Sequence, residues 1–136
     1  MKIKTDKGFA YVDVLVIIII VMLVISFIIG ITPVFIQKET QDNMARQIIR
    51  EAELTGGTGI EVQNFVSDIK DDTNFEIKSI SFDGTKYIGA TKKVQINDKI
   101  IVTIKSDFSW FSDFLGDGVS LELTSVATGR SGVYTK

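Results

Sequence analysis

The stretch that decides the fold is VLVIIIIVMLVISFIIGITPVFI, residues 14–36, which has 23 residues and no charged side chain. As an α-helix it spans about 34 Å, slightly more than the roughly 30 Å hydrocarbon core of a bilayer. It is apolar on every side, unlike a helix packed on a soluble core, and it is longer than the apolar region of a cleaved signal peptide. The sequence therefore predicts a transmembrane helix, placed at residues 9–37.

The charges on the two sides of this helix predict its orientation. Three lysines and one acid precede the apolar stretch, whereas Lys38 beyond it is soon offset by Glu39 and Asp42. Because positively charged flanks stay in the cytoplasm, we expect a single-pass membrane protein with a cytoplasmic N-terminus and residues 38–136 outside. The three lysines are Lys2, Lys4 and Lys7.

Two residues near the end of the apolar stretch predict a bend. Pro33 has no N–H group to donate to the carbonyl of Ile29, and Gly30 loosens the same turn. Such a bend is either a tolerated kink of a membrane helix or a flexible point used when helices pack into a bundle or fibre.

Asp13 is unusual for a helix that serves only as a membrane anchor. A carboxylate one turn inside an apolar helix costs a few kcal/mol unless it is paired or reaches the interface. A local explanation is that Asp13 reaches toward the lipid headgroups or meets Lys7.

The N-terminal sequence resembles the N-terminus of type IV pilin-like proteins. It consists of MKIKTDKG (1–8) followed by FAYVDVLVIIIIVML (9–23). The resemblance implies a basic leader, residues 1–8, that a prepilin peptidase removes after Gly8, so that Phe9 becomes the N-terminus and Asp13 the fifth residue. Most members of the family have glutamate where this chain has aspartate. The resemblance further implies that Asp13 of one subunit pairs with the α-amino group of Phe9 on a neighbour.

Beyond the membrane segment, residues 38–55 keep a helical pattern. Met44, Ile48 and Ala52 share one face, and Gly56 and Gly57 supply a stop. We therefore predict an amphipathic helical stem that continues the transmembrane helix.

Residues 56–136 are predicted to form a small extracytoplasmic α+β head. A helical period over residues 58–72 indicates a second, short helix. Alternating patterns then predict strands of an antiparallel sheet at residues 75–82, 93–97, 100–105 and 119–127, with Asp98-Lys99 as a tight turn.

The C-terminal stretch NDKIIVTIKSDFSWFSDFLGDGVSLELTSVATGRSGVY resembles the TadE-like group of Tad-type minor pilins. That group has a polar turn, a strand, an aromatic-rich loop, another strand and a following Arg. Here those places are taken by residues 101–104, 108–115 and 119–126 and by Arg130.

Four aromatic residues crowd the loop before the last strand. Either their rings cover one face of the sheet, because a head without disulfides has little other core material, or they form a subunit contact or dip into the outer leaflet. These residues are Phe108, Trp110, Phe111 and Phe114.

The composition argues against catalysis, cofactors and nucleic acid. The chain has no His and no Cys, which excludes a conventional serine triad, thiolate nucleophiles and Cys/His metal sites. Residues 38–136 carry 12 basic and 15 acidic side chains, so we expect no direct nucleic-acid binding. We expect no enzyme, no metal and no cofactor.

The function that these patterns favour is a pilin-like structural subunit, most simply a minor one, of a Tad-like pilus or a related secretion or conjugation apparatus. Its partners would be membrane lipid, a prepilin peptidase and other pilin-like subunits, and it would reach the cell surface once processed. The alternative is an unprocessed single-pass membrane protein whose extracytoplasmic domain binds a partner.

Overall fold

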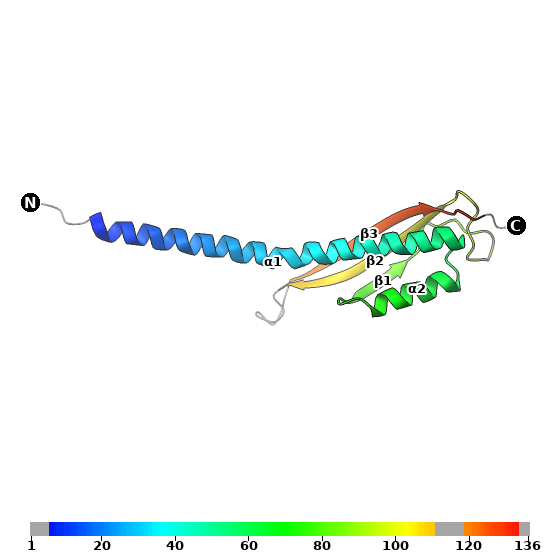
Figure 1. The fold of residues 1–136 in the computed structure, drawn as a ribbon, viewed down its shortest axis with the longest axis horizontal. Coiled ribbons are helices and arrows are strands. Elements are labelled where there is room, and N and C mark those ends of the chain that lie inside the picture. The colour runs from blue at the N-terminus through cyan, green and yellow to red at the C-terminus, as the bar shows by residue number, and fades with distance from the viewer. Residues whose placement is uncertain (1–5, 111–118, 134–136) are drawn as a thin grey trace, which may run out of the picture. The chain divides into compact units, whose positions relative to one another are not determined.

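The computed structural model describes residues 6–110 and 119–133 (Figure 1). The chain divides into two compact units, Met1–Phe35 and Ile36–Lys136, which are described separately below. The elements follow the order α1 (Asp6–Thr55), α2 (Ile60–Asp71), β1 (Ile77–Ser81), β2 (Lys99–Trp110) and β3 (Val119–Arg130). This order confirms the α+β class, with a long apolar N-terminal helix, a short helix and a small antiparallel sheet.

In the first unit, α1 presents apolar side chains to its surroundings on all sides. Large hydrophobic side chains between Tyr11 and Ile29 are exposed, and α1 is the one described helix that is long and apolar enough to cross a membrane. This observation supports the predicted membrane segment by length and composition.

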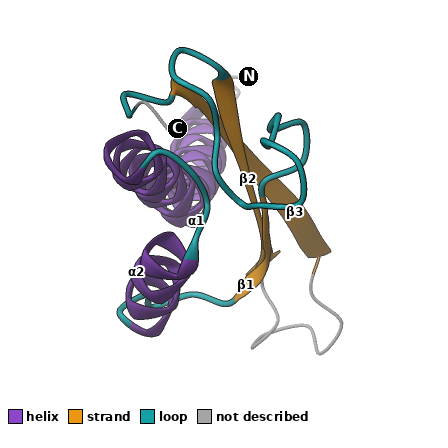
Figure 2. Cartoon of the chain, turned by 90° about the vertical axis from the view of Figure 1, so that its right-hand side faces the viewer, coloured by secondary structure: helices purple, strands orange, loops and turns teal. Residues whose placement is uncertain are grey.

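In the second unit, three antiparallel strands form a sheet in the order β1-β2-β3. β2 and β3 pair without interruption from Lys99↔Arg130 to Trp110↔Val119, whereas the pairing of β1 with β2 has an irregularity between Ile77 and Ser79. The second half of α1 and the whole of α2 lie on the same face of this sheet (Figure 2).

The core of the second unit lies between these helices and the sheet. The predicted stem face of α1 is buried, including Met44, Ile48 and Ala52, and it meets the alternate residues of β2 that point toward the helices. Those residues are Ile100, Val102 and Ile104. α2 contributes buried Val62 and half-buried Phe65, Val66 and Ile69, as its period predicted.

The predicted helix stop is confirmed. α1 ends at Thr55, and Gly56 adopts a φ of 72°, a left-handed conformation that costs glycine little. The N–H of Gly57 then donates to the carbonyl of Ala52 at 3.1 Å.

The predicted strand at residues 93–97 is wrong. Lys93 forms only an isolated bridge with Gly57, and Asn97 has a φ of 67°, far outside the range of regular strands. The alternation that suggested a strand reflects one residue, Val94, which is fully buried and donates its N–H to the carbonyl of Gly56 at 2.8 Å. The segment is thus a loop pinned to the end of α1.

β3 approaches α1 closely because its helix-facing residues are small. Ser125 is buried, and Ala127 and Gly129 follow it in the same row. A Cβ atom added at Gly129 would overlap Ile49 Cγ2 and the carboxylate of Glu53. That carboxylate accepts the backbone N–H of Arg130 at 2.8 Å, so it cannot move away without losing a hydrogen bond.

We therefore expect Gly129→Ala to lower the free energy of unfolding by about 1–3 kcal/mol, the usual cost of forcing extra atoms into a packed interface. Chemical denaturation of the detergent-solubilised chain, followed by circular dichroism, measures this change. Gly59→Ala is the matched control, since nothing lies within 4 Å of the added atom. Equal effects of the two substitutions would contradict the close approach of β3 to α1.

Candidate functional site

The residues implicated in processing lie at the start of α1. Lys2 and Lys4 are outside the described residues, whereas Lys7, Gly8 and Phe9 belong to the first turns of the helix. Asp13 is exposed among exposed apolar side chains such as Tyr11 and Val14. Among residues 11–109 and 120–133, whose side chains the structure describes, none forms a hydrogen bond or ion pair with the Asp13 carboxylate, and the side chain of Lys7 lies outside this set.

α1 remains helical through Pro33. The hydroxyl of Thr32, the residue directly before Pro33, donates to the carbonyl of Ile28 at 2.9 Å, a bond that often accompanies bending of helices. The bend around Gly30 and Pro33 stays a prediction.

The aromatic cluster is only partly described. Phe108 is half-buried on β2, in the row of residues that faces the helices. The backbone of Trp110 pairs with Val119 at the end of the strand ladder. Phe111 and Phe114 lie outside the described residues, so the choice between core and contact stays open for them.

The feature that sequence analysis missed is a polar seam between α1 and the sheet, made of Gln37, Gln41, Ser106 and Ser125. All four residues are buried. The Gln37 amide donates to Ser106 Oγ at 3.1 Å, and Ser106 Oγ donates to Gln41 Oε1 at 3.0 Å. Gln41 Nε2 in turn donates to the carbonyls of Ile104 at 2.7 Å and Leu123 at 3.2 Å.

The edge of the seam is an ion pair on the β3 side of α1. The ammonium group of Lys38 donates to the Asp42 carboxylate and, at 2.7 Å, to Ser125 Oγ. Hydrogen bonds from Lys38 and Ser125 hold the pKa of Asp42 below its ordinary value of 3.8, in spite of some desolvation. Because both charged side chains are partly exposed, the pair positions α1 more than it stabilises the fold.

The chemistry of the seam is structural. Every buried side-chain N and O atom in the described residues has a hydrogen-bond partner, and a fully satisfied polar network fixes one arrangement of its elements. Among these residues no cluster of acids is placed to hold a metal ion. The seam therefore sets the rotation and height of α1 on the sheet.

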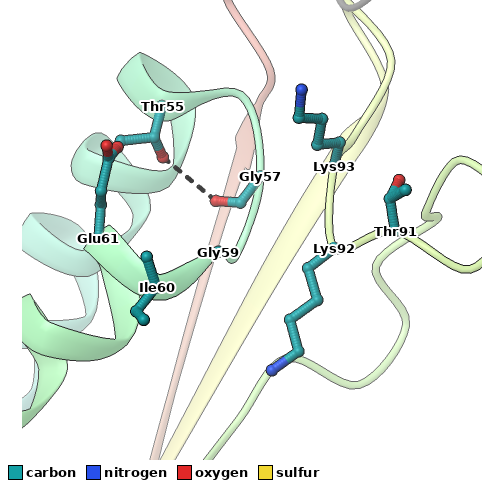
Figure 3. Close-up of a pocket in the computed structure, with 8 residues that line it drawn as sticks. All are labelled: Thr55, Gly57, Gly59, Ile60, Glu61, Thr91, Lys92 and Lys93. Atoms are coloured by element: carbon teal, nitrogen blue, oxygen red, sulfur yellow. Dashed lines mark hydrogen bonds between the residues drawn. The ribbon is translucent and has the colours of Figure 1, made fainter.

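A pocket at the other end of the head lies beside the α1–α2 turn (Figure 3). It is lined by Thr55, Gly57, Gly59, Ile60, Glu61 and residues 91–93. The side chains of Lys92 and Lys93 point in opposite directions in Figure 3 and do not converge on a common point. The pocket thus offers no focused binding chemistry.

The outer edge of β3 has no strand partner among residues 6–110 and 119–133. Ile101 uses its N–H and C=O to bond the Thr85 hydroxyl, on the side away from β3, so its partner Thr128 must direct its own backbone groups outward. By the alternation of the ladder, Ser120, Glu122, Thr124 and Val126 do the same. No hydrogen bond joins these outward groups to another described residue, which leaves a strand edge available to an extended partner.

The signal for the polar seam was present in the sequence. Gln37 and Gln41 are spaced i, i+4 and continue the same helical face as Ala45, Ile48 and Ala52. A glutamine on the buried side of an amphipathic helix indicates a partner in the core, whereas Gln47, on the opposite face, is exposed.

We expect Gln41→Ala to lower the free energy of unfolding by about 1–3 kcal/mol. The Ser106 hydroxyl loses its acceptor, and the carbonyls of Ile104 and Leu123 lose the amide donor. Gln47→Ala, on the exposed side of the same helix, is the control and should change stability by less than about 0.5 kcal/mol. Denaturant titration of both variants is the measurement. A loss at Gln47 equal to that at Gln41 would exclude the seam as the cause.

The lowered pKa of Asp42 predicts a pH dependence. A carboxylate with a depressed folded-state pKa contributes stability above its ordinary value of 3.8, and this contribution is lost as pH falls through the folded-state pKa. The stability difference between wild type and Asp42→Asn should thus be largest above about pH 5 and shrink below the ordinary pKa. Asp68→Asn is the control, because exposed Asp68 has no ion-pair partner among the described residues. A difference that stays constant from pH 3 to 7 would contradict the assignment.

Comparison with known proteins places the chain in a family without assigning an activity. Residues 18–136 match the family described as a domain of unknown function, DUF4320. This match includes most of the apolar stretch and the whole head, and it leaves out residues 1–17. No curated protein and no solved structure matches the chain. Since the match covers most of its length, the chain belongs to the DUF4320 family.

Proposed function

We propose that the chain is a pilin-like structural subunit, most simply a minor one, of a Tad-like pilus or a related secretion or conjugation apparatus. In this proposal a prepilin peptidase removes residues 1–8 at the cytoplasmic face. The subunit then assembles with others through its N-terminal helix, and the head stays outside the membrane.

The observation that carries the proposal is the position of Asp13. Its carboxylate is exposed on an apolar helix, and none of residues 11–109 and 120–133, whose side chains the structure describes, pairs with it. In a lipid environment an unpaired carboxylate is costly and therefore functional by default. The α-amino group that cleavage after Gly8 would create on a neighbouring copy is a cation of the required charge at the required depth.

The two parts of α1 have different surroundings, and this difference supports the same proposal. From Gln37 to Glu53 one face of the helix is engaged by the head. From Tyr11 to Ile29 its large hydrophobic side chains are exposed, so that part is available for packing against lipid or other apolar helices.

The second candidate is an unprocessed single-pass membrane protein with a partner-binding domain. The open edge of β3 favours it, because an extended segment of another protein can add a strand there through backbone hydrogen bonds. The two candidates differ at the N-terminus of the mature chain, which begins at Phe9 in the first and at Met1 or Lys2 in the second.

The first experiment determines that N-terminus. The chain is expressed with a prepilin peptidase of its own host, purified from membranes and analysed by intact mass and N-terminal sequencing. We expect a chain that begins at Phe9, and we expect Gly8→Val to prevent cleavage. A wild-type chain that keeps residues 1–8 in the presence of an active peptidase would exclude the pilin-like function and favour the second candidate.

The second experiment separates the charge of Asp13 from its other properties. Asp13→Asn removes the charge with little change in size, and Asp13→Glu keeps the charge. Removing one partner of a buried ion pair costs about 3–5 kcal/mol, so Asn should reduce association roughly a hundredfold or more, whereas Glu should retain it. Cross-linking in intact membranes measures association, and Val12→Ala on the same helix is the control.

All four chains should remain in the membrane fraction, because the apolar stretch is unchanged. Wild-type levels of cross-linked oligomers in Asp13→Asn would refute the role of this carboxylate in assembly.

A further inference from the structure

A groove at the end of the head opposite to residue 36 is lined by three cationic side chains. It has a volume of about 490 Å³ and lies between the loop after β1 and the paired ends of β2 and β3. Lys86, Lys99 and Arg130 contribute the positive charges, and half-buried Asp98 contributes one acid. The remaining lining comes from Gly84, Asn97, Thr128 and Gly129.

The groove holds two like charges at one register position. Lys99 and Arg130 are direct partners across the β2–β3 ladder, so both side chains stand on the same face of the sheet. Like charges placed directly opposite each other destabilise a strand pair. No salt bridge within the described residues relieves Lys86, Lys99 or Arg130, and all three are exposed.

Arg130 is held in place by two contacts, neither of which is a salt bridge of its guanidinium group. Its guanidinium Nη1 donates to Asn97 Oδ1 at 3.0 Å, and its backbone N–H is bound by the Glu53 carboxylate. Asn97 itself has a φ of 67°, a conformation that is uncommon outside glycine and that often marks functional positions. A neutral amide thus orients the arginine without removing its charge.

This end of the head differs in charge from the rest of the molecule. Residues 83–99 contain four lysines and two aspartates, whereas the other residues of 38–136 contain eight basic and thirteen acidic side chains. The local excess of positive charge attracts anions that the remainder of the head repels.

We propose that this groove binds the phosphate groups of a linear polyanion. The arginine supplies a planar fork that matches a phosphate, and the two lysines supply point charges for neighbouring phosphates. An open groove admits a chain. None of its lining residues is aromatic, so it offers no platform on which bases can stack. The ligand is therefore recognised by its charged backbone.

The test compares variants with equal changes in net charge. Lys86→Ala/Lys99→Ala removes two groove cations that make no side-chain hydrogen bond within the described structure. Arg46→Ala/Arg50→Ala removes two exposed cations from α1. Each full-length chain is studied in non-ionic detergent, and the probe is inorganic polyphosphate, titrated at several salt concentrations by fluorescence anisotropy.

We expect the groove variant to bind polyphosphate at least tenfold more weakly than wild type, and the α1 variant to bind within twofold of it. The slope of log K against log salt should be shallower for the groove variant, because fewer counterions are released when fewer cations contact the polyanion. Polyphosphate should raise the Tm of wild type but not of the groove variant. Without ligand, the groove variant should be at least as stable as wild type, since it loses a like-charge pair.

The proposal is overturned if both variants lose affinity equally, because binding then depends only on net charge, or if wild type does not bind at 50 mM salt. Oligo(dT) and oligo(dA) of equal length test whether the bases of a ligand contribute to binding. Equal affinities for the two support recognition of the phosphate backbone, while a preference of fivefold or more for one base overturns it. The outcome is independent of leader cleavage and of Asp13.

Discussion

The structure of the head depends on the docking of the second half of α1 onto the sheet. Ile48 and Ala52 are completely buried against β2, and the row of small residues on β3 lets the helix come close enough to exclude water. The sheet has three strands and one apolar face, and such a face must be covered by another element. The helix is therefore part of the domain, and the compact unit begins at Ile36.

This constraint explains which parts of the fold could be predicted from the sequence. The spacing of Met44, Ile48 and Ala52 shows the buried side of the stem, and the period of α2 is equally clear, because in both cases apolar side chains themselves form the contact. The loop before β2 could not be predicted in this way. There, Val94 is anchored by a backbone hydrogen bond to Gly56, and its alternation with polar neighbours imitates a strand.

The candidate sites could be predicted to different degrees, depending on whether their residues are close together in the sequence or meet only in the fold. Asp13 is conspicuous because a charge interrupts an apolar run, and its local sequence shows this without any knowledge of the fold. The basic groove is invisible in the sequence, because Lys86, Lys99 and Arg130 are far apart in the chain and meet only through the register of β2 and β3. The polar seam lies between these extremes, since the spacing of Gln37 and Gln41 was informative but their partners on the sheet were not.

The seam begins directly after the apolar stretch of α1. The apolar stretch ends at Ile36, and Gln37 is the first buried residue of the head. If an apolar pair replaced Gln37 and Gln41, the buried face of α1 would be apolar from residue 37 to Ala52, and no buried side-chain hydrogen bond would favour one height of the helix on the sheet over another. With glutamines, burial is favourable only where Ser106 and the carbonyls of Ile104 and Leu123 receive them. The seam thus gives α1 a single docked position on the sheet.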